Sequence, residues 1–269
     1  VVATDTPIND RFRIHTKQYA YRTYAIAFKL DHTPNPALIW DTADPYHYIR
    51  LQDNYLIVGA EDHRVGQMPS EDPFKNLEKW SREHFNNLPE EVAYQWSGQI
   101  YEPMDQMAYI GKNSKEESSI FIITGQSGFG MTASAMGAEL ISDLIEKGKS
   151  AFEEVYSPSR ITLRDLPTYV EENVNVALQY RDWLRPSPSI PANDLKEIQA
   201  VFGSQCLNTK EGKLPKSCAV CPHLGAVVRW NSIEKTWDCP AHGSRFNATG
   251  QVIEGPACSN LDEEDEEEY

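Results

Sequence analysis

Two short stretches near the C-terminus, Cys221-Pro222-His223-Leu224-Gly225 and Cys239-Pro240-Ala241-His242-Gly243, carry the clearest pattern in this chain. Each stretch pairs one cysteine with one histidine and ends in a glycine, which lets the backbone turn tightly and bring amide groups close to sulfur. The intervening residues 226–238 predict a strand, a turn and a second strand. We therefore expect two loops that meet on a small β scaffold.

Two cysteines and two histidines in alternating order suit a 2Fe–2S centre in which two thiolates hold one iron and two imidazoles hold the other. The sequence predicts Cys221, His223, Cys239 and His242 as these ligands. A structural zinc site is one alternative, since zinc also takes Cys and His, although zinc patterns usually run Cys-x-x-Cys before the histidines. A disulfide with two unrelated histidines, and a chance arrangement, are the others.

The stretches CPHLG and CPAHGSRF resemble the cluster loops of Rieske domains, and the resemblance covers roughly residues 196–259. It implies the four ligands named above. High-potential respiratory members carry a disulfide where this chain has Ala226 and Ala241, and a Tyr donor where it has Phe246. Ser244 is left as a hydroxyl donor. Because fewer donors stabilise the reduced cluster less, we expect a reduction potential below the respiratory type.

Composition narrows the classes of partner. The 269 residues carry a net charge of −15, which argues against nucleic acid and anionic membranes. No apolar run approaches the length of a membrane span. Cys206, Cys218 and Cys258 are left once the ligands are assigned, and an odd remainder fits the cytoplasm or another reducing compartment. The acidic run within 260–269 predicts a disordered, solvated tail, with a docking role as the alternative.

Hydrophobic patterning predicts the elements of the N-terminal half. Strands are expected at 19–30 and 37–40, a hairpin over 46–60, and an amphipathic helix at about 74–86 whose aromatic residues belong to the core. A buried strand at 119–124 comes next. It leads into a glycine-rich turn and a helix at 132–145. The apolar stripe of that helix is expected to comprise Met136, Leu140, Leu144 and Ile145.

The turn Thr124-Gly125-Gln126-Ser127-Gly128-Phe129-Gly130-Met131 joins that strand to that helix. Strand, glycine-rich turn and helix is the geometry that aims a helix N-terminus, with its partial positive charge, at a ligand. A phosphate or an anionic flavin ring would suit it. The alternative is a tight turn whose glycines serve packing alone.

The stretch 151–195 is punctuated by prolines and predicts a connector with one helix at about 168–184. The buried face of that helix is expected to comprise Val170, Val174, Leu178 and Trp183. The predicted organisation is therefore a first domain at 1–150, this connector, a cluster-binding domain at 196–259, and the tail at 260–269.

Residues 1–150 resemble the C-terminal part of D-amino-acid-oxidase-like FAD-dependent oxidoreductases, on the segments 96–111 and 124–131 and on a first strand at 1–4. The resemblance implies an α/β (α+β) flavoprotein domain, here incomplete, followed by a small all-β Rieske domain. It also implies that the turn lies along FAD through Gly125, Ser127, Gly128, Phe129, Gly130 and Met131. The family's Gly-x-Gly-x-x-Gly turn is absent from this sequence. We therefore expect the C-terminal portion of a longer protein, with FAD bound in the full-length form.

The two resemblances together imply an oxidoreductase that oxidises an amine-like small molecule and passes electrons singly to a 2Fe–2S cluster and then to an unidentified partner. The stretch alone is expected to be inactive, and no catalytic residue can be named. Possible substrate contacts are Tyr48, Arg50, His63 and Arg64, although a structural role is the preferred interpretation of each. The alternative is an electron-transfer module without catalysis that works through exposed His223 and His242. A zinc-stabilised interaction protein is a third.

Overall fold

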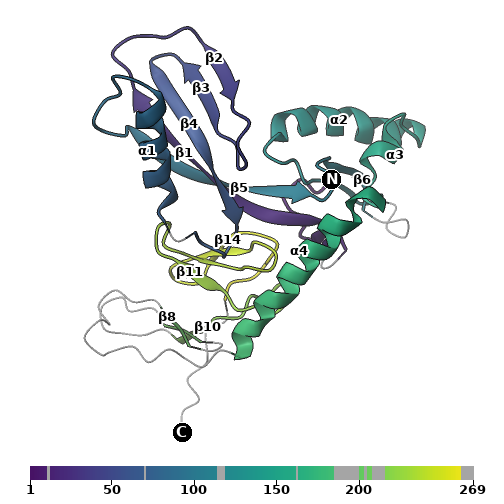
Figure 1. Cartoon of the computed structure of the whole chain (residues 1–269). Coiled ribbons are helices and arrows are strands. Elements are labelled where there is room, and N and C mark those ends of the chain that lie inside the picture. Colours follow the sequence, from purple (N-terminus) through teal and green to yellow (C-terminus); the bar gives the residue numbers. More distant parts are fainter. Residues whose placement is uncertain are drawn as a thin grey trace. The chain divides into compact units, whose positions relative to one another are not determined.

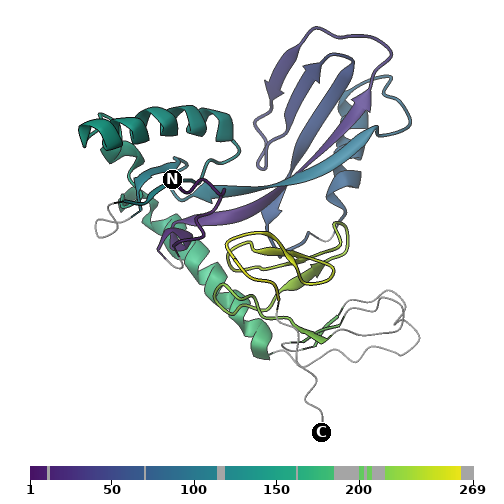
Figure 2. The same cartoon turned by 180° about the vertical axis from the view of Figure 1, so that it is seen from behind.

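The computed structural model describes residues 1–10, 13–69, 71–113, 119–161, 163–184, 200–202, 205–207 and 216–261. It divides into two compact units, one formed by Val1–Ala20 with Ile100–Tyr269, the other by Tyr21–Gln99 (Figures 1 and 2). The chain passes from one unit to the other within strands β1 and β5, so the two units share these two segments of backbone.

The unit at 21–99 is built on a five-stranded sheet with the order β2-β3-β4-β1-β5. Its strands are β1 (Gln18–Lys29), β2 (Ala37–Trp40), β3 (Tyr48–Gln52), β4 (Tyr55–Arg64) and β5 (Tyr94–Pro103). The pairs β2–β3, β3–β4 and β1–β4 are antiparallel. These strands confirm the predicted strands and hairpin of this region.

Helix α1 (Pro73–His84) packs against β4 and closes one face of that sheet. The side chain of Asp72 caps the helix by accepting a hydrogen bond from the backbone N of Phe74 at 3.0 Å. Leu77 is fully buried, with Phe74 and Trp80 packed beside it. The aromatic residues of α1 therefore belong to the core, as predicted.

The other unit contains a hairpin of β6 (Tyr109–Lys112) and β7 (Phe121–Thr124), and Val2 pairs in parallel with Ile122 of β7. Helix α2 (Gly130–Lys147) packs on this hairpin and is followed by the short helix α3 (Glu153–Tyr156). The predicted strand, turn and helix are confirmed. Leu140 and Leu144 are buried as expected, but Ile145 is exposed, because it lies a further 100° around the helix from Leu144.

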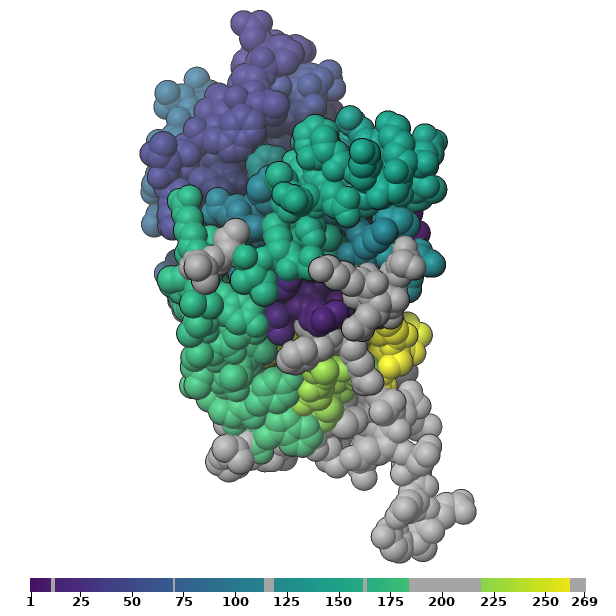
Figure 3. Space-filling view, turned by 90° about the vertical axis from the view of Figure 1, so that its right-hand side faces the viewer, coloured from purple at the N-terminus to yellow at the C-terminus, as the bar shows by residue number. Residues whose placement is uncertain are grey.

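The connector contains the short helix η2 (Leu163–Asp165), then α4 (Leu166–Gln179) and η3 (Tyr180–Leu184), and the N-terminal segment contains η1 (Ile14–Thr16). In Figure 3 the segment that contains α4, drawn in green, lies next to the N-terminal segment, drawn in purple. Asn173 of α4 donates a hydrogen bond to the carbonyl oxygen of Thr16 at 2.9 Å. The connector and the N-terminal segment are thus in direct contact.

The predicted buried face of the connector helix is wrong. The four side chains predicted to be buried are each about half exposed: Val170, Val174, Leu178 and Trp183. The buried side chains are instead polar, at Glu172, Gln179 and Asp182. Arg229 donates to Gln179 at 2.8 Å and forms an ion pair with Asp182 at 2.6 Å, and these partners make the burial of polar groups tolerable.

The C-terminal part of this unit holds two small antiparallel sheets. The first has the order β10-β9-β8, with β8 (Ala200–Phe202), β9 (Gln205–Leu207) and β10 (Lys216–Cys218). The second has the order β11-β12-β13-β14, with β11 (Arg229–Asn231), β12 (Thr236–Asp238), β13 (Arg245–Asn247) and β14 (Val252–Glu254). Trp237 and Phe246 are buried in its core.

Three predictions fall partly outside the described residues. The side chains of Cys206 and Cys218, the connector at 185–195 and the acidic run at 262–269 all lie there. Within the part of the chain that is described, no helix combines the length and apolar character needed to cross a membrane.

Candidate metal centre

The two Cys–His stretches form two loops of the same backbone design. In each loop the closing glycine donates its N–H to the carbonyl oxygen of the cysteine, Gly225 to Cys221 at 2.9 Å and Gly243 to Cys239 at 3.1 Å. Both glycines have positive φ, +79° and +85°, a conformation that L side chains rarely adopt. The glycines that the sequence singled out are therefore required by the turn.

The loops bring the two cysteines together in the core beside the β11–β14 sheet, with Trp237 and Phe246. Both side chains are buried, and their sulfur atoms are within hydrogen-bonding distance of each other. The contact with Cys239 lowers the pKa of Cys221 to about 7, against the effect of burial, with further help from the amides of His223 and Leu224 and from Ser244. The partner thiol, Cys239, has its pKa raised, first by Cys221 and then by burial. The pair thus readily provides at least one thiolate, the form that binds metal.

The two histidines lie beside each other with ring centroids 5.0 Å apart and ring planes at 90°. Burial, followed by the neighbouring His223 and His15, lowers the pKa of His242 to about 3. Neutral imidazole is the form that ligates metal, so this environment fits the role predicted for it. The side chains of His223 and His242 are only 6% and 9% exposed. The expectation that they are exposed is therefore wrong.

The donor set fits two irons with two protein ligands each. Among the described side chains of His, Cys, Asp and Glu, no group of three or more is arranged around one ion position. A two-iron cluster held by two thiolates and two imidazoles does not require such a group. Backbone amides also point at the sulfurs, from His223 and Leu224 toward Cys221 and from Ala241 and His242 toward Cys239. Such donors stabilise bound thiolates.

Residues far away in the sequence hold the first loop in place. The hydroxyl of Tyr180 donates to the carbonyl oxygen of Leu224 at 2.8 Å, and the indole N–H of Trp183 donates to that of Gly225 at 2.9 Å. Burial, followed by the nearby Cys239 and Cys221, raises the pKa of Tyr180 to about 12, so the hydroxyl keeps its proton. The connector thus fixes the loop that carries the first candidate ligand pair.

The second loop is held from β5 and from the N-terminal segment. The hydroxyl of Tyr101 lies 3.2 Å from the carbonyl oxygen of His242 and 3.1 Å from that of Gly255. The ring of His15 stands edge-on to the rings of His223 and His242, with centroid distances of 4.7 and 6.0 Å. Sequence reasoning missed Tyr101, His15 and Tyr180, because nothing in the local sequence says which distant residues contact the loops.

The glycine-rich turn between β7 and α2 has the geometry that the sequence predicted. Gly125, Ser127 and Gly128 all have positive φ, and the positions above Gly128 and Gly130 are open. Phe129 and Met131 are 60% and 89% exposed, although both are apolar. The hydroxyl oxygen of Ser127 is buried and has no hydrogen-bond partner. Exposed apolar side chains beside a polar atom and open glycines suit a flat ligand such as a flavin.

The four candidate substrate contacts all have structural partners or an outward position. Tyr48 shares a hydrogen bond with the hydroxyl of Thr23 at 3.2 Å, and His63 stacks on Tyr24. Arg64 lies over the ring of Tyr21, and Arg50 is exposed on β3. The structure does not bring these four side chains together in one binding site.

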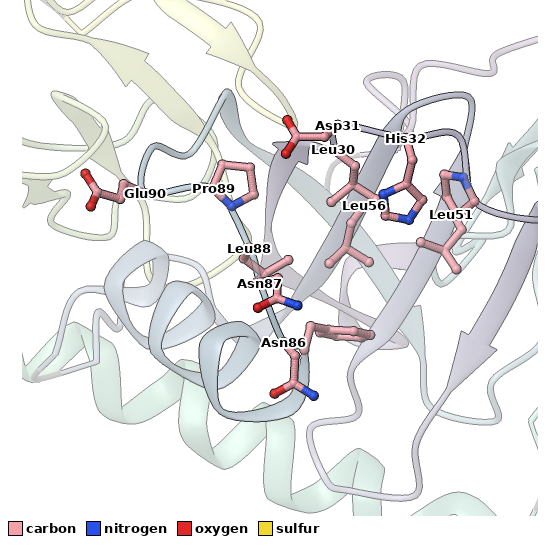
Figure 4. A pocket seen from close by; sticks show the side chains of 12 residues that line it. Leu30, Asp31, His32, Leu51, Leu56, Asn86, Asn87, Leu88, Pro89 and Glu90 are labelled. Carbon is pink, nitrogen blue, oxygen red and sulfur yellow. The ribbon is translucent and has the colours of Figure 1, made fainter.

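A pocket in the same unit lies elsewhere, between the loop after β1 and the loop after α1 (Figure 4). Its volume is about 740 Å³, and its lining includes His32, Leu51, Asn87 and Glu90. None of the four candidate substrate contacts lines it.

Comparisons with known proteins agree with both halves of the sequence-based interpretation. Residues 2–144, just over half of the chain, match the family model described as FAD dependent oxidoreductase. Residues 184–264 match the model described as Rieske [2Fe-2S] domain. The two matches support both cofactors, FAD and a 2Fe–2S cluster, and confirm the predicted fold class. The chain is thus related to redox proteins.

Among individual relatives, the Bacillus subtilis (strain 168) protein YhfW, named as a Rieske 2Fe-2S iron-sulfur protein, is 37% identical over 179 residues, 64% of this chain and 35% of its own. The cytochrome b6-f complex iron-sulfur subunit 1 of Nostoc sp. (strain PCC 7120) is 56% identical over 43 residues, 16% of this chain and 24% of its own. The chain therefore spans about a third or less of the length of these relatives.

Among solved structures, glycine oxidase from Geobacillus kaustophilus is 19% identical with a TM-score of 0.45, covering 54% of this chain and 40% of that one. The extent of the family match decides the assignment: this chain belongs to the FAD dependent oxidoreductase family and carries a C-terminal Rieske [2Fe-2S] domain.

Proposed function

We propose that this chain is the cluster-bearing part of an FAD-dependent oxidoreductase, and that Cys221, His223, Cys239 and His242 hold a Rieske 2Fe–2S cluster. The observation that carries the proposal is the pair of matched loops, which put two buried thiols in contact and two imidazoles beside each other. Cys221 and Cys239 would bind one iron, and His223 and His242 the other. The amides and Ser244 around the sulfurs would stabilise the reduced, more negative state.

The turn at 125–131 is the proposed contact with FAD. Gly128 and Gly130 would let the cofactor approach the backbone closely, and the buried hydroxyl of Ser127 would gain a hydrogen-bond partner. Gly125 would shape the turn, because Pro103 fills the space beside it, 2.7 Å from a Cβ at that position. Phe129 and Met131 would cover an apolar face of the ring system, which explains their exposure here. The N-terminus of α2 would favour negative charge on the bound group.

The proposed reaction is oxidation of an amine-like small molecule. When bound, FAD takes two electrons from such a substrate and can release them one at a time, which suits a one-electron acceptor. The chain's own contribution is to hold the cluster in a buried, hydrogen-bonded environment. A second candidate function is an electron-transfer module without catalysis. The burial of both histidine ligands weighs against it, because a docking partner would need their edge.

The cluster is proposed to have a low potential. Phe246 is fully buried and, being phenylalanine, offers the cluster no hydroxyl. Ala226 and Ala241 cannot form a disulfide, because neither has a thiol. Ser244 and the loop amides are the donors to sulfur. A clearly positive, respiratory-like midpoint in a redox titration of the purified protein would contradict this expectation.

Absorption and EPR spectra of the purified chain, expressed with iron and sulfide available, test the assignment directly. A rhombic EPR signal with low average g in the reduced state would support the cluster, and bound zinc in a colourless protein would refute it. Replacing His223 by Cys should change that signal. The matched control is His84→Cys, because His84 lies exposed at the end of α1, far from the loops in sequence. Flavin bands in the full-length protein would separate the enzyme from the module.

A further inference from the structure

His15 is a third histidine at the candidate cluster, contributed by the opposite end of the chain. It lies in η1, is only 2% exposed, and its ring stands 4.7 Å from that of His223 and 6.0 Å from that of His242. No motif marks it, because it is separated from both candidate ligands by more than half of the sequence. Its burial against two ligand rings calls for an explanation.

The hydrogen bonds of His15 fix its protonation and orientation. Nε2 lies 2.6 Å from the carbonyl oxygen of Asp10, which can only accept, so Nε2 carries the proton. The hydroxyl of Thr6 lies 3.5 Å from Nδ1. Both ring nitrogens therefore have partners, and the ring edge is held against the two candidate ligands.

The contact continues away from the cluster through buried polar side chains. Gln18 donates its amide N–H to the hydroxyl oxygen of Thr6 at 3.4 Å, and its carbonyl oxygen lies 3.0 Å from the hydroxyl of Thr124. Gln18 thus connects Thr6 with Thr124, whose hydroxyl also lies 2.6 Å from the carbonyl oxygen of Asp5. The side chains of Thr124, Gln18, Thr6 and His15 are each at most 3% exposed. Thr124 is the last residue of β7 and directly precedes Gly125. The series thus links the proposed FAD turn to the ligand histidines.

The N-terminal segment around His15 also contacts the stretch that follows β14. A Cβ at Gly255 would lie 3.2 Å from the side chain of Thr6 and 3.8 Å from that of Ile8. The sulfur of Cys258 lies 3.8 Å from the carbonyl oxygen of Ile8. Tyr101 binds the carbonyl oxygens of His242 and Gly255 from β5. The side of the centre formed by His223 and His242 therefore contacts residues that belong to the FAD dependent oxidoreductase match, His15 and Tyr101.

We propose that His15 is a positioning residue of the cluster: it closes the edge formed by His223 and His242 and, through Thr6 and Gln18, joins that edge to the turn that contacts FAD. The electron partner at this edge is then the oxidoreductase part of the same polypeptide, and an external carrier does not dock there. This inference rests on the proposed function, since it takes His223 and His242 as ligands and the turn as the FAD contact.

The test uses the cluster-loaded chain and compares His15→Ala with His15→Phe and the exposed-site control His84→Ala. Partners that orient metal ligands typically change metal affinity or activity about 10–100-fold when removed, so bleaching of the cluster by a chelator should accelerate about tenfold in His15→Ala. His15→Phe keeps the edge covered and should bleach close to the wild-type rate. The midpoint potential of His15→Ala should rise, because water admitted to the edge stabilises the more negative reduced cluster.

A wild-type bleaching rate together with an unchanged midpoint potential and EPR signal in His15→Ala would overturn the inference. If that variant does not assemble a cluster, Thr6→Val keeps the imidazole and removes only the hydroxyl that orients it. A shifted EPR signal and midpoint in Thr6→Val would support positioning, and unchanged values would overturn it. A wild-type chain that lacks the Rieske signal altogether would instead refute the proposed function, so the two failures are distinguishable.

Discussion

Ser244 donates its hydroxyl to the sulfur of Cys221, while its oxygen accepts a hydrogen bond from the backbone N–H of Ala257 at 3.0 Å. The amide of Ala257 fixes the direction of the hydroxyl, so the proton points at sulfur. Hydrogen bonds to the sulfurs set the reduction potential of iron–sulfur clusters. Since Phe246 supplies no second hydroxyl, the potential should depend strongly on this one contact.

Ser244→Ala should therefore lower the midpoint potential of the cluster. Loss of one hydrogen bond is worth about 1 kcal/mol, which corresponds to roughly 40 mV for a one-electron couple. Protein-film voltammetry or an EPR-monitored redox titration would measure the shift. Ser232→Ala is the matched control, because Ser232 is exposed in the turn between β11 and β12. An equal potential in wild type and Ser244→Ala would mean that the hydroxyl does not act on the cluster.

Arg245 is the electrostatic centre of the small domain. Its guanidinium is buried and lies 3.0 Å from Asp238, 3.0 Å from Glu254 and 3.2 Å from Glu234. Burial alone would lower the pKa of Arg245, but the three carboxylates raise it, so the charge is held firmly. Removing it would leave the buried carboxylate of Asp238 without its cation.

Arg245→Met should destabilise the Rieske domain by about 3 kcal/mol, the usual cost of breaking a buried ion pair from one side. The control is Lys147→Ala, because Lys147 pairs with Asp143 on the exposed surface of α2 and such pairs contribute little. Thermal unfolding of the cluster-loaded protein, followed by cluster absorbance, would give both values. Similar losses in the two variants would show that the buried network adds nothing to stability.

The sequence anticipated the loops well and their surroundings poorly, for a physical reason. Cys221 and His223 are neighbours in the chain, so residue types and a closing glycine report their local geometry directly. The apolar residues of the connector helix also gave a clear period, yet that face is exposed at Val174 and Leu178. Periodicity identifies an apolar face, but it cannot tell what covers that face.

The contacts of the candidate site with distant residues could not be predicted from one sequence. His15 and Tyr180 reach the cluster loops only because the tertiary fold brings 1–20 and the connector beside the small domain. Neither residue belongs to a local pattern of ligands, caps or turns. The strand, turn and helix around Gly125 were predictable because they are continuous in the sequence.

Asp62 on β4 predicts a pH dependence of stability. Burial, with a smaller contribution from Glu61, raises the pKa of Asp62 above its ordinary value of 3.8, although a hydrogen bond with Thr23 opposes the shift. One carboxylate oxygen is buried without a hydrogen-bond partner. The folded state therefore binds this proton more tightly than the unfolded state, and the contribution to stability falls as pH rises above the unfolded pKa.

Asp62→Asn should remove that dependence and increase the free energy of unfolding near neutral pH by about 1 kcal/mol, because a buried charge is replaced by a neutral amide. Urea titrations from about pH 4 to about pH 7 would compare the two slopes. Asp53→Asn, in the exposed turn between β3 and β4, is the control with the same chemical change. If wild type and Asp62→Asn keep the same pH profile, Asp62 is ionised without penalty in the fold.

Gly59 on β4 is required by the ring of Tyr48, its direct neighbour across the sheet on β3. A Cβ at this position would overlap the Tyr48 ring, and the ring cannot swing away without losing the hydrogen bond between its hydroxyl and that of Thr23, at 3.2 Å. The sheet thus uses the missing side chain to let Tyr48 cross to β1.

Gly59→Ala should destabilise the sheet by about 2 kcal/mol through overpacking. Gly98→Ala on β5 should have little effect or stabilise slightly, because its Cβ would meet only the methyl group of Thr23 at 3.9 Å, and glycine weakens a strand interior. Both variants add one methyl group to the same sheet, so chemical denaturation isolates the steric effect. Adding Tyr48→Ala to Gly59→Ala should cancel most of the overlap. A double variant that keeps the full penalty of Gly59→Ala would place its cause in the backbone and not in the tyrosine ring.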